Sequence, residues 1–316
     1  MPQAMNILIV GLGSIARKHI QALHDLSIEA QIYALRSKQD ATSYEGVINL
    51  YDLNALPVSF DFAIISAPTH LHGYYIKELT RRAIPLFIEK PPLSGLIHAD
   101  ETAALIRQTS LLTYVACNLR FHPCIDFLKE FFSQRSQKRV NEVNVYCGSY
   151  LPDWRPDQDY RKVYSAVKSQ GGGVHLDLFH ELDYVRWIFG LPDKVHVVKR
   201  NSSSLNIDAY DYANYLLEYQ DFTASIVLNY YRRDAKRTIE IVFAEETWTV
   251  DLLANLIQNS TGEVIYKTET FRIADTYKYQ MEYFLKKLQD NQLPMNTFAE
   301  SLETLKISLY DEKVIE

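Results

Sequence analysis

The chain of 316 residues has few cysteines, no excess of positive charge and no long hydrophobic run. Its three cysteines form no C-x-x-C pair, so we expect buried free thiols in a reducing compartment rather than a disulfide framework. The net charge of −6 leaves no broad basic surface, so no nucleic-acid partner is expected. No apolar run reaches the roughly 20 residues of a membrane helix, and no signal-peptide pattern opens the chain. These absences predict a cytoplasmic globular protein without a membrane partner.

The first segment with a recognisable chemistry is a glycine motif. The unbroken apolar run Ile7–Val10 predicts a strand buried on both faces of a parallel sheet, and Gly11-Leu12-Gly13-Ser14-Ile15-Ala16 follows it. In this G-x-G-x-x-A pattern, the first glycine permits a tight turn, the second lets the backbone approach a pyrophosphate, and the third small residue allows close helix packing. A helix from about Ser14 towards Leu26, with His19 on its packing face, and a second strand at Ala30–Leu35 complete the unit. The context predicts a dinucleotide site at residues 11–15.

The tip of the second strand bears on the choice of cofactor. NAD-preferring sites usually place an acidic residue there to bind the ribose 2′-hydroxyl. This chain has Arg36-Ser37-Lys38 instead, which offers positive charge and a hydroxyl group to a 2′-phosphate. We therefore expect NAD(P), with a preference for NADP. The alternative is that these are solvated loop residues in an enzyme that binds NAD through other contacts.

Strands and helices continue to alternate up to about residue 120. Phe60–Ser66 is the next predicted strand, followed by Ala67-Pro68-Thr69, where Thr69 is expected to cap a helix that carries His72. A strand at Leu86–Ile88, a helix from Ser94 and a strand at Thr113–Cys117 follow. This order predicts an α/β Rossmann domain with a doubly wound parallel sheet.

The strand at Leu86–Ile88 ends abruptly in Glu89-Lys90-Pro91-Pro92. Proline has no N–H to donate, so it stops the strand and leaves Lys90 at the carboxyl end, where open α/β sheets bind ligands. Taken alone, the segment fits an exposed Glu–Lys pair before a turn better. The flanking motifs reverse that preference and favour a functional lysine.

After about residue 120 the pattern changes. A helix is predicted from Phe121 to Phe132, and Asn141–Tyr150 alternates as in a sheet with one buried face. Helices are expected again at Asp275–Leu288 and Ala299–Leu309. The chain thus divides into residues 1–120 and residues 121–316, the second an α+β domain with an open, mainly antiparallel sheet. Its further alternating runs are Val195–Lys199, Asp211–Tyr219, Phe222–Tyr231, Thr238–Phe243, Thr247–Leu252 and Glu263–Thr268.

Residues 151–170 form a loop dense in aromatic and basic groups, among them Trp154, Arg155, Tyr160 and Arg161. Such side chains suit stacking on a polar ring and hydrogen bonding to it. They would equally suit an arm that packs on another subunit. The two interpretations remain open.

The segment after Gly171-Gly172-Gly173 is predicted to be one helix over 174–187. It places Asp177, His180 and Asp183 on one face, which is costly to bury unless the face serves a polar site. Histidine titrates near neutral pH, so His180 is a candidate acid–base group. A structural alternative is a core histidine bonded to Asp183. No third soft ligand stands at a zinc-type spacing, so no metal is expected.

Together these motifs resemble the glucose–fructose oxidoreductase and inositol dehydrogenase (Gfo/Idh/MocA) family. The resemblance rests on the Gly11 motif, Ala67-Pro68-Thr69-x-x-His72, Glu89-Lys90-Pro91, Asn118-x-Arg120-Phe121, and the Gly triplet with Asp177, His180 and Asp183. It implies a Rossmann domain and a C-terminal α+β domain whose sheet often forms a homodimer or homotetramer interface. It also implies that the last helix, about 298–314, packs back toward the nucleotide domain.

The resemblance further implies roles for individual residues. Lys90 would polarise the reacting hydroxyl of a sugar, His180 would take its proton as hydride leaves for nicotinamide C4, and Asp177 would orient the sugar or the lysine. Many members place the aspartate four residues before the histidine, whereas here the interval is three, which keeps one helix face but changes the direction of the carboxylate. The cofactor would meet Ala67, Pro68, Thr69, His72, Glu89, Lys90 and Asn118, and the substrate would meet Arg120.

The form Asp-Leu-x-His-Glu-Leu-Asp-Tyr resembles members from surface-polysaccharide pathways, which indicates a sugar or nucleotide-sugar substrate. The pairs Trp154-Arg155 and Tyr160-Arg161 would suit a carboxylate or phosphate on it. The leading hypothesis is an NAD(P)-dependent oxidoreductase acting on a secondary alcohol or ketone. The alternatives are a redox-assisted glycoside hydrolase that retains its NAD, and a non-catalytic nucleotide-binding regulator.

Overall fold

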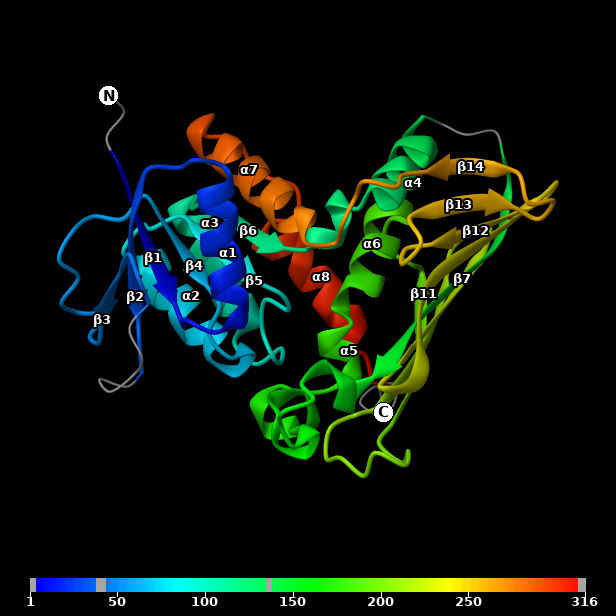
Figure 1. The fold of residues 1–316 in the computed structure, drawn as a ribbon, viewed down its shortest axis with the longest axis horizontal. Coiled ribbons are helices and arrows are strands. Elements are labelled where there is room, and N and C mark those ends of the chain that lie inside the picture. The colour runs from blue at the N-terminus through cyan, green and yellow to red at the C-terminus, as the bar shows by residue number, and fades with distance from the viewer. Residues whose placement is uncertain (1–3, 38–43, 135–137, 312–316) are drawn as a thin grey trace. The chain divides into compact units, whose positions relative to one another are not determined.

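The computed structural model describes residues 4–37, 44–134 and 138–311, which form two compact units (Figure 1). The first comprises the chain up to Cys117 together with Ala274–Leu305, and the second comprises Asn118–Ile273 together with the residues from Lys306. This division differs from the expected split at residue 120, because the chain returns to the first unit at Ala274. No helix in the described part of the chain has the length and apolar character needed to cross a membrane.

The sheet of the first unit has six parallel strands in the order β3-β2-β1-β4-β5-β6, which confirms the doubly wound Rossmann-like fold. The apolar runs form its centre because both faces are covered: every residue of β4, β5 and β6 is buried. The short β3 was not predicted, because its half-buried sequence lacks an apolar run. The strands are β1 Met5–Val10, β2 Ala30–Leu35, β3 Val47–Leu50, β4 Phe62–Ile65, β5 Leu86–Glu89 and β6 Thr113–Ala116.

Helix α7 explains why the chain returns to this unit. It packs beside α1, and its Phe284 ring meets Phe62 of β4 and Phe87 of β5 with ring centres 5.1 and 5.3 Å apart. Burial of such a large side chain contributes about 1.5–3 kcal/mol, enough to fix the helix to the sheet. The helices are α1 Ser14–Asp25, α2 His72–Arg81, α3 Ala99–Thr109, α7 Asp275–Gln289 and α8 Phe298–Leu309.

Two predicted helix starts were wrong. Thr69 does not cap α2; it opens a short 3-10 turn, Thr69–Leu71, and Leu71 is the residue that precedes the helix. Helix α3 begins at Ala99 rather than Ser94, because His98 has a left-handed backbone (φ +63°) that an α-helix cannot include.

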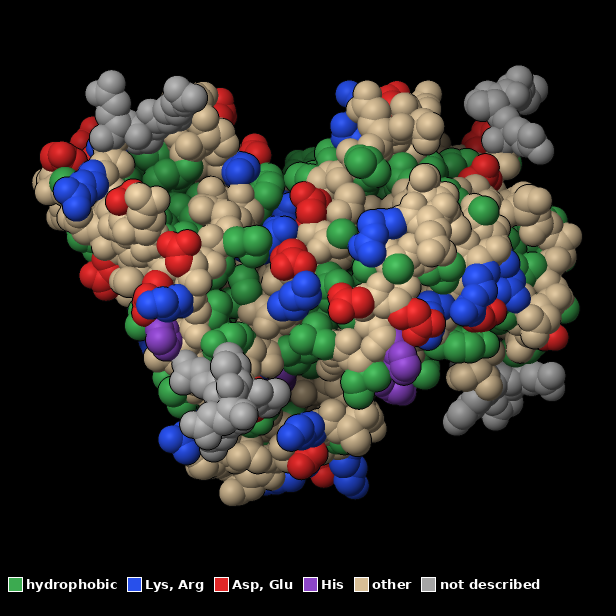
Figure 2. Space-filling view, turned by 180° about the vertical axis from the view of Figure 1, so that it is seen from behind, with side chains coloured by type: hydrophobic (Ala, Val, Ile, Leu, Met, Phe, Trp, Pro, Cys, Tyr) green, Lys and Arg blue, Asp and Glu red, His purple; other side chains and the backbone are tan. Residues whose placement is uncertain are grey.

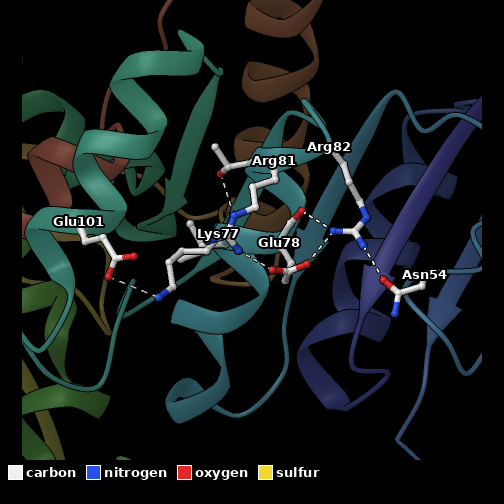
Figure 3. A network of polar contacts seen from close by, with 8 residues as sticks. Asn54, Lys77, Glu78, Arg81, Arg82 and Glu101 are labelled. Atoms are coloured by element: carbon white, nitrogen blue, oxygen red, sulfur yellow. Dashed lines mark hydrogen bonds and ion pairs between the residues drawn. The ribbon is translucent and has the colours of Figure 1, made fainter.

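Surface ion pairs join α2 to its neighbours (Figure 3). Glu78 accepts from Arg82, which also reaches Asn54 at 2.9 Å, and Lys77 approaches Glu101 of α3 at 3.7 Å. Exposed pairs of this kind contribute about 0–1 kcal/mol each, so they orient side chains more than they stabilise the fold.

The second unit contains an eight-stranded sheet in the order β14-β13-β12-β11-β7-β10-β9-β8, antiparallel except where β7 meets β10. This confirms the mainly antiparallel sheet, whereas β13 was not predicted. The strands are β7 Val140–Tyr150, β8 Lys194–Arg200, β9 Tyr212–Glu218, β10 Thr223–Asn229, β11 Tyr231–Phe243, β12 Thr247–Asp251, β13 Leu256–Asn259 and β14 Val264–Lys267.

One face of this sheet is buried, as the alternation predicted: Val143, Val145 and Cys147 of β7 belong to the core together with side chains of α4, Pro123–Ser133. The helix predicted over 174–187 is interrupted. Leu178 has φ −94° and ψ 39°, outside the helical range, and it separates α5, Val174–Asp177, from α6, Phe179–Phe189. Asp177 and His180 therefore do not share one regular helix face.

Acidic and basic side chains are interspersed on the face shown in Figure 2, and among the described residues drawn there no continuous basic surface forms.

Candidate active site

The glycine turn between β1 and α1 has the shape of a phosphate cradle. Gly11 has φ +84°, and a Cβ there would lie 2.8 Å from the Cα of Ala67, so only glycine fits. A Cβ on Gly13 would meet nothing within 4 Å, so the backbone borders open space at the start of α1. Among the described residues, no side chain caps this helix and no acidic residue occupies its first turn. The free N–H groups and the helix dipole therefore fit a dinucleotide pyrophosphate.

The tip of β2 holds Arg36. Its backbone N–H donates to Leu50 O at 2.8 Å and its guanidinium donates to Asn49 Oδ1 at 3.2 Å, so β3 braces it. Ser37 beside it is exposed, and Lys38 lies outside the described residues. No carboxylate occupies positions 36 and 37. The preference for NADP stays a prediction, and this arrangement is compatible with it.

His72 joins the two segments expected to meet the nicotinamide half of the cofactor. Its ring nitrogens lie 2.9 Å from Ala67 O and 3.1 Å from Pro91 O. Burial lowers the pKa of His72, so the ring is neutral near pH 7 and donates to one carbonyl at a time. It thus ties the turn at Pro68 and the buried Thr69 to the residues after Lys90. The contacts of these residues with the cofactor stay predictions.

Glu89 is bound by His19, for which the sequence indicated only a packing role. The Glu89 carboxylate, 8% exposed, accepts from Nε2 of the fully buried His19 at 2.6 Å and from the backbone N–H of Lys90 at 3.3 Å. His19 Nδ1 is buried without a hydrogen-bond partner, so the hydrogen bond to Glu89 is made by Nε2 alone. A histidine on an otherwise apolar helix face was the available signal, but its partner is 70 residues away in sequence.

In the second unit, Asp183 forms a buried ion pair. Its two carboxylate oxygens accept from Arg120 Nε at 2.8 Å and Nη2 at 2.7 Å, and the Arg120 guanidinium lies 5.1 Å from the centre of the Trp187 ring. Asp183 is thus paired with Arg120, and its bond to His180 stays an alternative. His180 itself lies in the first turn of α6. The predicted substrate contact of Arg120 stays a prediction, and Asn118 opens the same short turn, Asn118–Phe121.

The aromatic and basic loop packs on its own unit. Trp154 Nε1 donates to Ser149 Oγ at 2.9 Å, Arg155 lies over the Tyr164 ring at 5.7 Å, and Tyr160 OH donates to Leu205 O at 3.1 Å. Arg161 lies over the Tyr160 ring. The cavity within the loop measures only about 10 Å³, room for one water, so these side chains would have to present their outer edges to a sugar.

Comparison with known proteins decides the family. The model of the oxidoreductase family with an NAD-binding Rossmann fold matches residues 5–117, and the model of the GFO/IDH/MocA C-terminal domain matches residues 136–249. The chain belongs to the Gfo/Idh/MocA family. A D-xylose 1-dehydrogenase (NADP(+)) from Haloferax volcanii is 23% identical over 94% of this chain and 93% of its own.

Solved structures of several dehydrogenases share the fold. A levoglucosan dehydrogenase in complex with NADH and levoglucosan has a TM-score of 0.84 at 15% identity, covering 97% of this chain and 95% of its own. The myo-inositol 2-dehydrogenase from Lactobacillus plantarum has a TM-score of 0.80 at 16% identity, with the same coverage. The WlbA dehydrogenase from Bordetella pertussis, in complex with NADH and UDP-GlcNAcA, has a TM-score of 0.82 at 17% identity, covering 97% and 94%. The protein is therefore an oxidoreductase with an NAD(P)-binding Rossmann domain.

Proposed function

We propose that this oxidoreductase transfers hydride between nicotinamide C4 and a secondary alcohol or ketone of a sugar or sugar derivative. The observation that carries the proposal is the strand end at Glu89-Lys90-Pro91, held by the buried His19–Glu89 bond in the same unit as an intact phosphate cradle. A lysine so placed at the carboxyl edge of a parallel sheet suits a reacting polar group next to a dinucleotide. A phosphate cradle alone would serve a regulator equally well.

The roles of the side chains follow from their chemistry. The Lys90 ammonium donates a hydrogen bond to the reacting oxygen and stabilises negative charge on it. The His180 imidazole takes the hydroxyl proton as general base, and in the reverse direction its imidazolium returns that proton to the oxygen of the ketone. The bound nicotinamide supplies the hydride acceptor or donor. In the oxidation, the alcohol would thus lose one hydride to the nicotinamide and one proton to His180.

The cofactor is proposed to be NADP in preference to NAD. Arg36 supports this, because a guanidinium braced by Asn49 suits a 2′-phosphate and no carboxylate at positions 36 and 37 is present to bind a 2′-hydroxyl. A titration with NADPH and NADH, followed by energy transfer from protein to nicotinamide, tests it. We expect Arg36→Ala to weaken NADPH binding about tenfold or more and to leave NADH binding within about twofold. An equal loss of affinity for NADPH and NADH would contradict the assignment of Arg36 to the 2′-phosphate.

The substrate is proposed to be a sugar or nucleotide sugar that carries a carboxylate or phosphate. Relatives named for D-xylose, levoglucosan and a UDP-sugar acid support the carbohydrate class, and the Arg155 and Arg161 side chains support the anionic group. Each candidate is incubated with NAD⁺ and NADP⁺ while absorbance at 340 nm is followed. We expect one reduced nucleotide for each ketone formed. Product that appears without net reduction of nucleotide would contradict net oxidoreduction and favour an enzyme that retains its cofactor.

A homodimer or homotetramer is proposed to form through the sheet of the second unit. Val198 of β8 and Leu216 of β9 project from the face opposite the helices and are 49% and 41% exposed. Light scattering after gel filtration measures the molar mass of the wild type and of a Val198→Glu/Leu216→Glu variant. The variant should dissociate, because buried charge in an interface is unfavourable. A wild-type protein that is monomeric at micromolar concentration would contradict it.

A further inference from the structure

Asp177 receives hydrogen bonds from two tyrosines that lie on different segments of the second unit. Its Oδ1 accepts from the Tyr164 hydroxyl at 2.5 Å and its Oδ2 accepts from the Tyr230 hydroxyl at 2.6 Å. Tyr164 belongs to the aromatic and basic loop, Tyr230 lies between β10 and β11, and Asp177 ends α5. Asp177 is 7% exposed and Tyr230 is fully covered, whereas Tyr164 is partly buried.

Both hydroxyl groups are suited to remain donors. Burial, together with the charge of Asp177, raises the pKa of Tyr164 and of Tyr230 well above the ordinary value, so neither loses its proton in the working range of an enzyme. Hydrogen bonds to a charged acceptor are the stronger kind, and a buried acceptor that lost its donors would keep the cost of desolvation. The three side chains therefore form one unit that fixes the loop to the sheet.

The two tyrosine rings support the side chains proposed to meet the substrate. Trp154 packs edge-on against the Tyr230 ring at 5.4 Å, and the Arg155 guanidinium lies 5.7 Å from the centre of the Tyr164 ring. The backbone of Gly172 packs closely on the loop backbone at Tyr164 and Ser165. A Cβ on Gly172 would lie 2.1 Å from Tyr164 O and 2.8 Å from Ser165 O. A displacement of Asp177 would therefore shift Tyr164 and Tyr230, and with them Arg155 and Trp154.

The local chain path explains why Asp177 faces these tyrosines. Because Leu178 interrupts the helix, Asp177 ends one helical segment and His180 lies in the first turn of the next. The interval of three residues thus does not place the carboxylate above His180, as one continuous helix would have done.

We propose that Asp177 is a positioning residue for substrate binding. It holds Tyr164 and Tyr230, and through their rings it holds Trp154 and Arg155 in place for a sugar that carries an anionic group. This inference rests on the proposed function for its substrate, but the state of the loop can be measured without any substrate.

Hydrogen–deuterium exchange of peptides from residues 151–170 in the complete protein provides that measurement. Tyr164→Phe, Tyr230→Phe and Asp177→Asn are compared with the parent; the last keeps the shape but has one acceptor oxygen in place of two. Tyr215→Phe is the matched control, since it removes another buried hydroxyl bond in the same unit, from Tyr215 to Ser308 O at 2.8 Å. We expect exchange of the loop to rise about tenfold in the three test variants and not in the control. Equal exchange in the loop for Tyr164→Phe, Tyr230→Phe and the control would overturn the inference.

Steady-state kinetics with the best substrate of the 340 nm screen separates positioning from catalysis. A positioning role predicts that Asp177→Asn raises KM about tenfold while kcat stays within about threefold, and that Tyr164→Phe does the same. A fall in kcat of two orders of magnitude in Asp177→Asn, with KM unchanged and the loop still protected, would show direct catalysis and overturn the proposal. If no candidate sugar reacts, the proposed function fails, and the exchange measurement still decides the role of Asp177 in the loop.

Discussion

His19 of α1 and Glu89 of β5 are joined by a buried bond of 2.6 Å, and the same carboxylate accepts from the backbone N–H of Lys90. The His19 ring also packs edge-on against Phe87, the residue two before Glu89, with ring centres 4.8 Å apart. The helix that follows the glycine turn thereby fixes the strand end that carries the lysine. The glycine motif and the Glu-Lys-Pro motif are linked by contact as well as by sheet order.

His19→Leu is expected to lower both stability and turnover. It leaves the Glu89 carboxylate buried with only the Lys90 N–H as a donor, and the lost bond costs about 1–3 kcal/mol of unfolding free energy, measured by urea denaturation. Turnover should fall about tenfold, since a misplacement of the Lys90 backbone weakens alignment. His24→Leu, an exposed position on the same helix, serves as the control. Stability and turnover equal to those of the control would refute the supporting role of the pair.

Gly13→Asp should separate binding from folding. A Cβ at this position meets open space, so the unfolding free energy should change by less than about 0.5 kcal/mol. A carboxylate at the start of α1 repels phosphate, and the affinity for NADPH should fall about 10- to 100-fold in a fluorescence titration. Gly13→Ala controls for the loss of glycine. Unchanged affinity in Gly13→Asp would argue against a pyrophosphate at this turn.

Asp183→Asn should be strongly destabilising. It leaves the Arg120 guanidinium, 2% exposed, without its counter-charge, which costs about 3–5 kcal/mol. The double variant Arg120→Met/Asp183→Leu should recover most of this loss, because apolar residues of similar volume need no charge partner. Urea denaturation of the parent, the single and the double variants gives the comparison. A double variant no more stable than Asp183→Asn would show that the pair is needed for more than charge balance.

His122 makes stability depend on pH. Its Nδ1 accepts from Cys124 N–H at 3.2 Å and its Nε2–H donates to Leu252 O at 3.1 Å, an arrangement that requires the neutral ring. Burial lowers the pKa of His122 from 6.5 to about 4. Between these values the unfolded chain binds a proton that the native chain does not, so stability is present above about pH 6.5 and is lost as pH falls toward 4.

His122→Asn keeps a cap acceptor at the start of α4 and removes the titrating group. The loss of unfolding free energy between pH 7 and pH 4.5 should therefore shrink by about 2 kcal/mol in this variant, measured by urea denaturation across that range. His24→Asn, on an exposed part of α1, should leave the profile unchanged. If the unfolding free energies of His122→Asn and the parent fell in parallel with pH, the acid sensitivity would belong to other groups.

Much of the fold was predictable because its signals are local. Unbroken apolar runs identified the buried strands β1, β4, β5 and β6, and alternation identified the one-sided sheet of the second unit. The site was less predictable, since the partners of its polar groups are distant in sequence. Glu89 meets His19 across 70 residues and Asp183 meets Arg120 across 63. The break at Leu178 could not be foreseen either, because leucine is a good helix former and the break depends on the packing around it.

The proposed role of Lys90 is tested by comparing the turnover of Lys90→Met with that of Lys77→Met, which changes a surface lysine of α2 in the same unit (Figure 3). Both are assayed at 340 nm with saturating nucleotide and the best sugar from the screen, after a fluorescence titration has shown that each still binds nucleotide. We expect Lys90→Met to lose about 10²- to 10⁴-fold in kcat/KM and Lys77→Met to stay within about twofold of the parent. Turnover of Lys90→Met at the parent rate would contradict the proposed role of Lys90 in hydride transfer.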